Sequence, residues 1–220
     1  MTVDGWQELT SERGRLFSPI GLRLVDDFTS RSAQGRLRAW IDRQVSPGVW
    51  APTDLAAVFT PSGAITWPGL GRLRDPLFAA PRRYRARVSA ERYRPAYLES
   101  ADGVEFDAPP WNDENDPNPV TRGSTDLYLY PAPTYDFPTW VRVLRGFVQD
   151  AQGAPVANVK VHLSNAERVL SDERGVFALP LRWATNGQLI DAVDARGGRS
   201  GQRTLSLPAD LQASVTITIA

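Results

Sequence analysis

Three arginines in the segment RRYRARVSAERYR occupy alternate positions. Arg83, Arg85 and Arg87 share one parity, and mostly apolar side chains fill the opposite parity. In a β-strand this alternation places the three guanidinium groups on one face, about 7 Å apart. Such a row could bind carboxylates through paired hydrogen bonds, or phosphates. Three alternatives stay open: a solvated face neutralised by acidic residues of the same domain, a contact with a partner protein, and a contact with nucleic acid.

An acidic segment could supply oxygen ligands for a cation. Residues 112–116 read Asn-Asp-Glu-Asn-Asp and are followed by Pro-Asn-Pro. Oxygen-bearing side chains at alternating positions suit Ca²⁺, but the segment lacks the glycine and the distal bidentate glutamate of an EF-hand loop. A solvated loop stiffened by proline and a calcium site are the two interpretations, and we expect the first.

Seven tryptophans raise the question of an aromatic binding surface. Trp40 stands on the polar parity of a segment whose other parity is apolar, so its indole is the best candidate for exposure. Tryptophan and arginine are enriched at the energetic centres of protein interfaces. We therefore predict a partner-binding surface that includes Trp6, Trp40 and the three arginines. Glycan binding by exposed tryptophans, as in some β-sandwich proteins, is the alternative.

The residue types that catalysis requires are scarce. The chain has no cysteine and a single histidine, His162, on the polar parity of its segment. The stretch from Gly198 to Gly201 lacks the spacing of a nucleophile elbow, and no glycine-rich loop joins a strand to a helix. A Lys–Asn isopeptide bond, known from pilus-type sandwiches, also fails, because Lys160 is the only lysine and the last strand has no asparagine. We expect no catalytic residue, no metal site and no cofactor.

The composition is that of a globular chain with balanced charge. Of 220 residues 42% are hydrophobic, and 25 basic residues balance 25 acidic ones. This balance argues against a dedicated nucleic-acid binder, which usually has a basic domain. There is no apolar run long enough for a transmembrane helix, and the N-terminal residues lack the regions of a secretory signal. We expect a cytoplasmic protein that acts without a membrane or nucleic acid.

The segment 141–220 carries the clearest structural pattern. Apolar residues alternate at Val159, Val161 and Leu163, and turns rich in Gly, Pro and Asp separate such runs. This period of two indicates a small β-sandwich. The motif Gly-x-Val-x-Asp-x-x-Gly-x-Pro-Val, followed by Val-x-Val-x-Leu and Asp-x-x-Gly-x-Phe-x-Leu, resembles the carboxypeptidase regulatory-like (transthyretin-like) family. The resemblance implies an accessory sandwich domain without catalytic residues.

The N-terminal half repeats this pattern. Residues 21–42 can be laid over residues 143–164, and three later stretches overlay in the same order. The sequence thus predicts an internal duplication and an all-β fold of two tandem small β-sandwich (transthyretin/Ig-like) domains. Two insertions, residues 67–83 and 102–123, distinguish the first copy. We expect them to cover open strand edges or to pack on the other domain.

These patterns divide the chain into four parts. They are an N-terminal arm (residues 1–16), a first β-sandwich with insertions (17–132), a linker (133–140) and a second β-sandwich (141–220). The arm either packs on its own domain or docks on a neighbouring subunit. The linker is stiffened by prolines. Its aromatic residues, Tyr135, Phe137 and Trp140, are expected to pack between the domains and to fix their angle.

The first half carries a second resemblance. The phrases LRLVDDFTSR, TPSGAITWPGLGR and RYRARVSAERYRPAYL look like those of small proteins that accompany contractile injection systems and other phage-tail-like particles. The resemblance implies a cap, baseplate or accessory component and transfers no individual residue. The sequence therefore predicts a non-enzymatic structural or adaptor protein that binds partner protein subunits. A glycan- or surface-binding β-sandwich module is the alternative.

Overall fold

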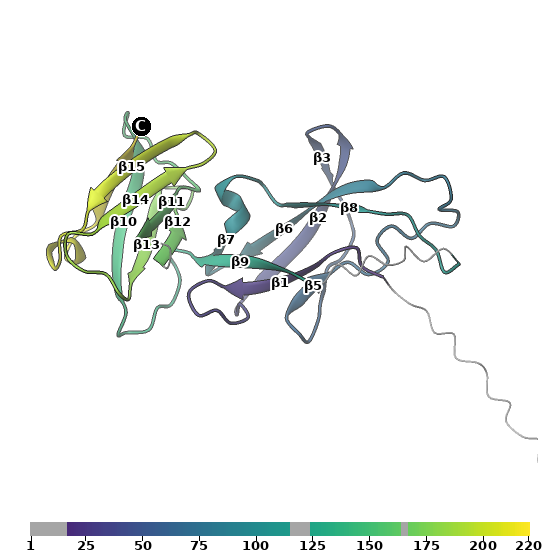
Figure 1. Cartoon of the computed structure of the whole chain (residues 1–220), viewed down its shortest axis with the longest axis horizontal. Coiled ribbons are helices and arrows are strands. Elements are labelled where there is room, and N and C mark those ends of the chain that lie inside the picture. Colours follow the sequence, from purple (N-terminus) through teal and green to yellow (C-terminus); the bar gives the residue numbers. More distant parts are fainter. Residues whose placement is uncertain (1–16, 115–123, 164–166) are drawn as a thin grey trace, which may run out of the picture.

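The computed structural model describes residues 17–114, 124–163 and 167–220. Over these ranges the chain forms strands β1–β16 and two short 3₁₀ helices, η1 (Ala96–Glu99) and η2 (Ala209–Leu211). Figure 1 shows two domains side by side, with β1–β9 in the first and β10–β16 in the second. The prediction of an all-β fold with two tandem β-sandwiches is confirmed. The N-terminal arm, including Trp6, lies outside the described residues.

One continuous sheet forms the first domain. Its strand order is β3-β2-β6-β7-β9-β1-β5-β4, and β8 also pairs with β6. The sheet folds over at the short strand β7, so that β2, β6 and β8 pack against β1, β5 and β9. The strands are β1 (Gly21–Asp26), β2 (Leu37–Ser46), β3 (Val49–Pro52), β4 (Val58–Phe59), β5 (Ala64–Thr66), β6 (Arg82–Ala90), β7 (Tyr93–Pro95), β8 (Val104–Ala108) and β9 (Thr125–Pro131).

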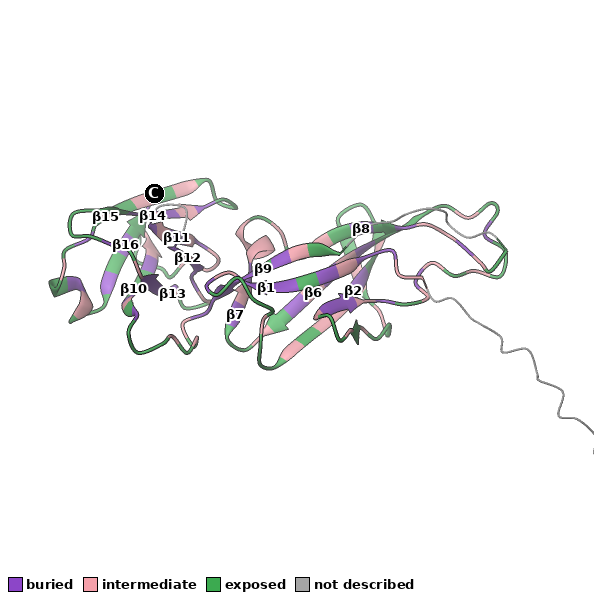
Figure 2. Ribbon diagram, turned by 60° about the horizontal axis from the view of Figure 1, so that its bottom comes forward, coloured by how far each residue is buried: buried purple, intermediate pink, exposed green. Residues whose placement is uncertain are grey.

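Apolar side chains between these two layers form the first core. Leu22 and Leu24 of β1 belong to the same cluster as Ile41 of β2 and Ala86 of β6, and all four are almost inaccessible to solvent. Burial alternates along β6, as Figure 2 shows, because successive side chains of a strand point to opposite faces. The parity expected for the arginine row is therefore confirmed.

The second domain is a sandwich of two separate sheets. One has the order β13-β10-β16 and the other β12-β11-β14-β15. Val159, Val161 and Leu163, whose alternation predicted a strand, are buried in the core between these sheets. The strands are β10 (Arg142–Asp150), β11 (Lys160–Leu163), β12 (Glu167–Leu170), β13 (Val176–Leu181), β14 (Leu189–Asp194), β15 (Arg199–Thr204) and β16 (Val215–Ile219).

Both domains share a strand-pairing pattern. The first strand of each pairs antiparallel with one neighbour, β5 or β13, and parallel with the last strand, β9 or β16. The pairs β2–β6 and β11–β14 also correspond. Other pairings differ: β4 joins β5 whereas β12 joins β11, and β7 links β6 to β9 whereas the sheets that hold β14 and β16 are separate. This common topology is what an internal duplication predicts.

The two insertions of the first domain pack on each other. Trp111 is buried, forms an isolated bridge with Arg72, and donates a hydrogen bond from Nε1 to the carbonyl oxygen of Leu70 at 2.9 Å. Leu70 in turn belongs to the first core. The insertions therefore close one end of the first sandwich.

Two of the three linker aromatics pack where the domains meet. The rings of Tyr135 and Phe137 lie 4.6 Å apart, and both pack edge-on against Phe28 of the first domain. Tyr135 Oη donates a hydrogen bond to the buried carboxylate of Asp26 at 2.8 Å. Burial and this bond raise the pKa of Tyr135. The cluster touches the second domain, because the guanidinium of Arg182 lies 4.6 Å from the Phe28 ring centroid.

Trp140 is the exception among the linker aromatics. Its side chain is 70% exposed, so the expectation that it packs between the domains is wrong. The next residue, Val141, is buried, and its N–H donates to the carbonyl oxygen of Pro138 across a tight turn. Because the turn directs Val141 inward, its neighbour is directed outward.

Ion pairs also join the two domains. Arg168 of β12 donates two hydrogen bonds to Asp27, at 3.1 and 2.7 Å. Lys160 of β11 donates to Glu99 of η1 at 2.8 Å. Further pairs join Arg94 to Glu173 and Arg196 to Asp102. The junction is thus held by hydrogen-bonded charges of complementary sign, with most of the basic groups in the second domain.

Candidate partner-binding face

The arginine row lies on the outer face of the first domain. Strand β6 pairs with β2 on one side and with β8 on the other. Cross-strand neighbours share a face, so Trp40, opposite Arg87, and Asp42, opposite Arg85, also point outward. We call this surface the arginine face. It comprises Trp40, Asp42, Trp50, Arg83, Arg85 and Arg87.

Arg85 is held most firmly. Its guanidinium donates two hydrogen bonds to Oδ2 of Asp42, at 2.8 and 3.3 Å, and lies 4.8 Å from the ring centroid of Trp50. The side chain of Arg85 is only 14% exposed and that of Asp42 only 7%. A cation held by a carboxylate on one side and an aromatic ring on another is well satisfied. Arg85 therefore organises the face rather than offering a free charge.

Arg87 and Trp40 form the more accessible end. The guanidinium of Arg87 lies 5.3 Å from the Trp40 ring centroid and 3.7 Å from the Asp42 carboxylate. Its side chain is 40% exposed, and Trp40 is half-buried. Sequence reasoning expected Trp40 to be the best exposed tryptophan. Trp140 and Trp183 are in fact more exposed, because Arg87 covers part of the Trp40 ring.

Arg83 occupies the opposite end of the row. It donates two hydrogen bonds to Glu105 of β8, the shorter at 2.7 Å, and lies 3.8 Å from Asp107. The hydrogen bond from Arg83 to Glu105 raises the pKa of the guanidinium, and the charge of Glu105 adds to this effect. Both acids belong to the second insertion. The row is thus neutralised in part by acidic residues of its own domain.

Sequence reasoning missed Trp50 and Asp42 as members of this face. The signal that could have found them is the turn Ser46-Pro47-Gly48, which joins β2 to β3. The hairpin register places Trp50 opposite Gln44, on the same face as Asp42. Within the described part of the chain, the structure brings together Trp40 and all three arginines of the predicted surface.

The acidic loop 112–116 is described only as far as Glu114. Within that part, the carboxylate of Asp113 pairs with Arg72 at 2.5 Å, and the side chain of Asn112 accepts a hydrogen bond from the Glu114 N–H at 3.0 Å. The last two residues of the predicted loop lie outside the described residues. Across the described ranges, no group of three or more His, Cys, Asp or Glu side chains is placed to hold a metal ion.

Two chemical properties of the arginine face bear on binding. It presents indole rings and guanidinium groups, which form van der Waals, cation–π and bidentate hydrogen-bonding contacts. Its only carboxylate from β2, Asp42, is committed to two arginines.

No helix in the described ranges is long and apolar enough to cross a membrane.

No family model matches this sequence, and no curated protein matches it. Neither resemblance drawn from the sequence is therefore supported by a family match. Among solved structures, the Bacillus anthracis TIE protein aligns at 10% identity over 92% of this chain and 33% of its own, with a TM-score of 0.28. The chain thus spans a third of that protein.

Two pilins are similar at the same level. A variant of the shaft pilin SpaA from Lactobacillus rhamnosus GG aligns at 15% identity over 91% of this chain and 96% of its own, with a TM-score of 0.30. A streptococcal ancillary pilin aligns at 9% identity over 91% of this chain and 67% of its own, with a TM-score of 0.25. Values this low define no shared function.

Proposed function

We propose that this protein is a non-enzymatic structural or adaptor protein that binds partner protein subunits through the arginine face. The observation that carries the proposal is the Trp40–Arg87 pair: both side chains are partly accessible, the guanidinium lies 5.3 Å from the indole centroid, and it is paired with the Asp42 carboxylate at 3.7 Å. Tryptophan and arginine dominate the energetic centres of protein interfaces when they are held in place before binding. The pairing with Asp42 supplies that preorganisation.

The junction supports the same proposal. Hydrogen-bonded ion pairs, such as Arg168 with Asp27, tie the second domain to the first. A joint of this kind keeps two sandwiches at a set angle, which suits a spacer or adaptor between subunits. A structural component of a particle needs such a fixed geometry more than it needs a reactive pocket.

The proposed setting is a phage-tail-like particle. The first-half phrases that look like those of injection-system accessory proteins lead us to propose a cap, baseplate or accessory component, assembled in the cytoplasm. The partners would be protein subunits of that assembly, with no nucleic acid or membrane involved. Purification of the native complex from the source cells, followed by identification of its subunits, tests this setting. Recovery of the chain without sheath, tube or baseplate proteins would contradict it.

The contact surface is tested by a double substitution. The double variant Trp40→Ala with Arg87→Ala is expected to lower the recovery of the partner with the purified protein at least about tenfold. Residues at interface centres of this type contribute about 2–4 kcal/mol to binding. The matched control, Trp183→Ala with Arg145→Ala, removes an exposed tryptophan and an exposed arginine from the second domain. Equal partner recovery by both variants, each folded by circular dichroism, would contradict the assignment.

One observation favours the second candidate function, a glycan- or surface-binding module. Trp140 and Trp183 are 70% and 73% exposed. Continuing the β10–β13 register, in which Arg142 stands opposite Leu181, places both tryptophans at the same end of that strand pair. Trp140→Ala with Trp183→Ala should then abolish binding on an oligosaccharide array. An array on which the unaltered protein binds no glycan removes this candidate.

A further inference from the structure

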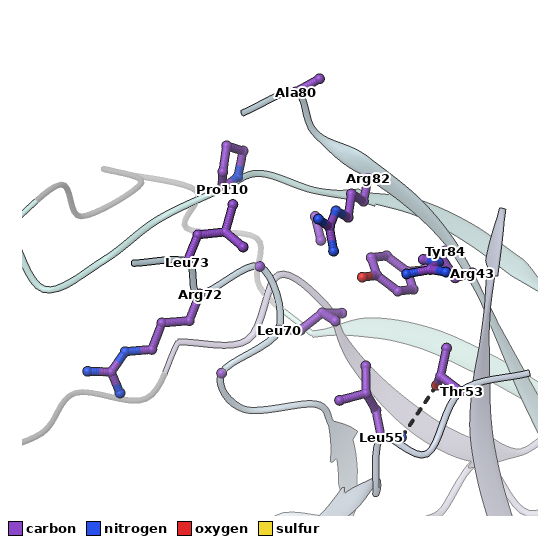
Figure 3. A pocket seen from close by; sticks show the side chains of 13 residues that line it. Arg43, Thr53, Leu55, Leu70, Arg72, Leu73, Ala80, Arg82, Tyr84 and Pro110 are labelled. Carbon is purple, nitrogen blue, oxygen red and sulfur yellow. Dashed lines mark hydrogen bonds between the residues drawn. The ribbon is translucent and has the colours of Figure 1, made fainter. Parts of the chain in front are cut away.

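A second group of arginines lies on the opposite face of the same two strands. Arg43 of β2 and Arg82 of β6 share the inward parity with Tyr84, which stands opposite Arg43 in the register. All three line a cavity of about 330 Å³ at the end of the first sandwich (Figure 3). Cavities of this size are at the lower end of the range for small-molecule sites.

The two arginines differ from those of the arginine face in having no partner among the described residues. Their side chains make no hydrogen bond or ion pair with any described residue. No carboxylate is among the described residues that line the cavity. The third lining arginine, Arg72, pairs with Asp113 and extends away from the other two in Figure 3. Two positive charges at one end of the cavity are therefore uncompensated by the described part of the chain.

The remaining wall is apolar. Leu55, Leu70, Leu73 and Pro110 lie around the cavity in Figure 3, beyond the polar end formed by the arginines and Tyr84. An apolar wall contributes affinity for a ligand body, and a few polar groups at one end fix its orientation. The cavity thus has a cationic end and an apolar body.

The apolar wall is built into the fold. The 3₁₀-like turn around Gly71 is tied to the second insertion, because the Trp111 N–H donates to the Gly71 carbonyl oxygen at 3.1 Å. Gly71 has a φ of +86°, and a Cβ at this position would collide with the carbonyl oxygen of Pro109. The close approach of the two insertions therefore requires glycine and keeps the cavity wall in place without a ligand.

We propose that this cavity binds a carboxylate carried on an apolar body. Guanidinium groups bind carboxylates through paired hydrogen bonds, and the Tyr84 hydroxyl can donate a further one. A cavity of about 330 Å³ is large enough for a small ligand. A medium-chain fatty acid and the C-terminal residue of an apolar peptide both have this chemistry and this size.

The test follows the arginine Nε–Hε resonances of the whole protein by ¹H–¹⁵N NMR, assigned by single Arg→Gln variants. Octanoate stands for the free acid and N-acetyl-leucine for a peptide terminus. We expect saturable shifts of Arg43 and Arg82 with a Kd on the order of 1 mM for at least one of them. The probe that binds more tightly identifies whether the ligand is a free acid or a peptide terminus. Octanamide, which keeps the size and loses the charge, should bind at least tenfold more weakly.

Two double variants of equal charge distinguish binding at Arg43 and Arg82 from a general effect of the protein's positive charge. Arg43→Gln with Arg82→Gln should weaken binding of the better probe at least tenfold. Arg38→Gln with Arg145→Gln removes the same charge from two exposed strand positions outside the cavity and should leave the affinity unchanged. Equal binding of octanamide, equal loss in both variants, or tighter binding of inorganic phosphate than of either carboxylate would each overturn the proposal.

Discussion

The two faces of β2 and β6 use arginine in opposite ways. On the outer face, Arg85 and Arg87 both lie within 4 Å of the Asp42 carboxylate, and both lie over an indole ring. On the inner face, Arg43 and Arg82 have no partner among the described residues. For arginines of the first kind the fold itself supplies the anion, whereas those of the second kind are left to bind an anion from outside. The junction arginines belong to the first kind.

The largest expected effect comes from removing the shared anion of the outer face. Asp42→Asn should lower the free energy of unfolding by about 2–3 kcal/mol, because it leaves the largely buried Arg85 without its main counter-ion. Urea denaturation measures this loss. Asp126→Asn is the control, because that carboxylate and its partner Arg23 are both accessible. A denaturation midpoint that moves no further for Asp42→Asn than for the control would contradict a stabilising role of Asp42.

The junction should respond next. Arg168→Gln removes two hydrogen bonds to Asp27 and should cost about 1–2 kcal/mol, because the carboxylate that loses its partner is mostly buried. Small-angle scattering should also show a larger radius of gyration as the domains separate. Arg174→Gln, which breaks an ion pair within one turn of the second domain rather than one between the domains, is the control. An unchanged radius would show that the remaining junction contacts hold the domains together without this ion pair.

Acid should weaken the second domain through its paired carboxylates. Burial opposes the ionisation of Asp194, but the Gly197 N–H and the Arg199 guanidinium both donate to it and lower its pKa on balance. Asp210 behaves in the same way through Ser206 and Arg203. A carboxylate whose pKa is lowered by folding stabilises the folded state at pH values above its pKa in the unfolded chain, about 4. This stabilisation is lost as the pH falls below that value.

The measurement for this prediction is the unfolding free energy of the second domain between pH 7 and pH 2, followed by NMR. Asp194→Asn should lower stability at neutral pH and flatten the decline below about pH 4. A steeper decline in the variant than in the unaltered protein would contradict the sign worked out for these groups.

The smallest effect on stability is expected at the inner face. Arg43→Gln with Arg82→Gln should change the free energy of unfolding by less than about 0.5 kcal/mol, because no described partner is lost and both side chains are exposed. Thermal and urea denaturation both measure this. A loss comparable to that of Asp42→Asn would mean that these arginines, too, support the fold.

Parity along a strand could be predicted from the sequence, whereas partners across strands could not. The alternation around Tyr84 and Ala86 correctly separated the outer arginines from the core. Which carboxylate meets which arginine depends on the register of β6 against β2 and β8, and those strands lie far apart in the sequence. Long-range register of this kind is set by packing of the whole domain.

Two features, the exposure of Trp140 and the cavity, could not be predicted from local sequence patterns. The exposed position of Trp140 follows from a tight turn, which alternation alone does not report. The cavity depends on the contact between two insertions, and neither insertion shows the other in its own sequence. A usable signal was nevertheless present. Arg43 shares its parity with the buried Ile41, and an arginine on the core parity marks either a strand end or a site.

On β2 and β6 the fold supplies the anion for Arg85 and Arg87, and it leaves Arg43 and Arg82, which have no partner among the described residues, to bind one from outside. The most direct measurement compares the Nε–Hε resonances of Arg43 and Arg82 with those of Arg85 and Arg87 in one octanoate titration. We expect saturable shifts for Arg43 and Arg82 and stationary signals for Arg85 and Arg87. Equal shifts of all four, or shifts confined to Arg85 and Arg87, would contradict it.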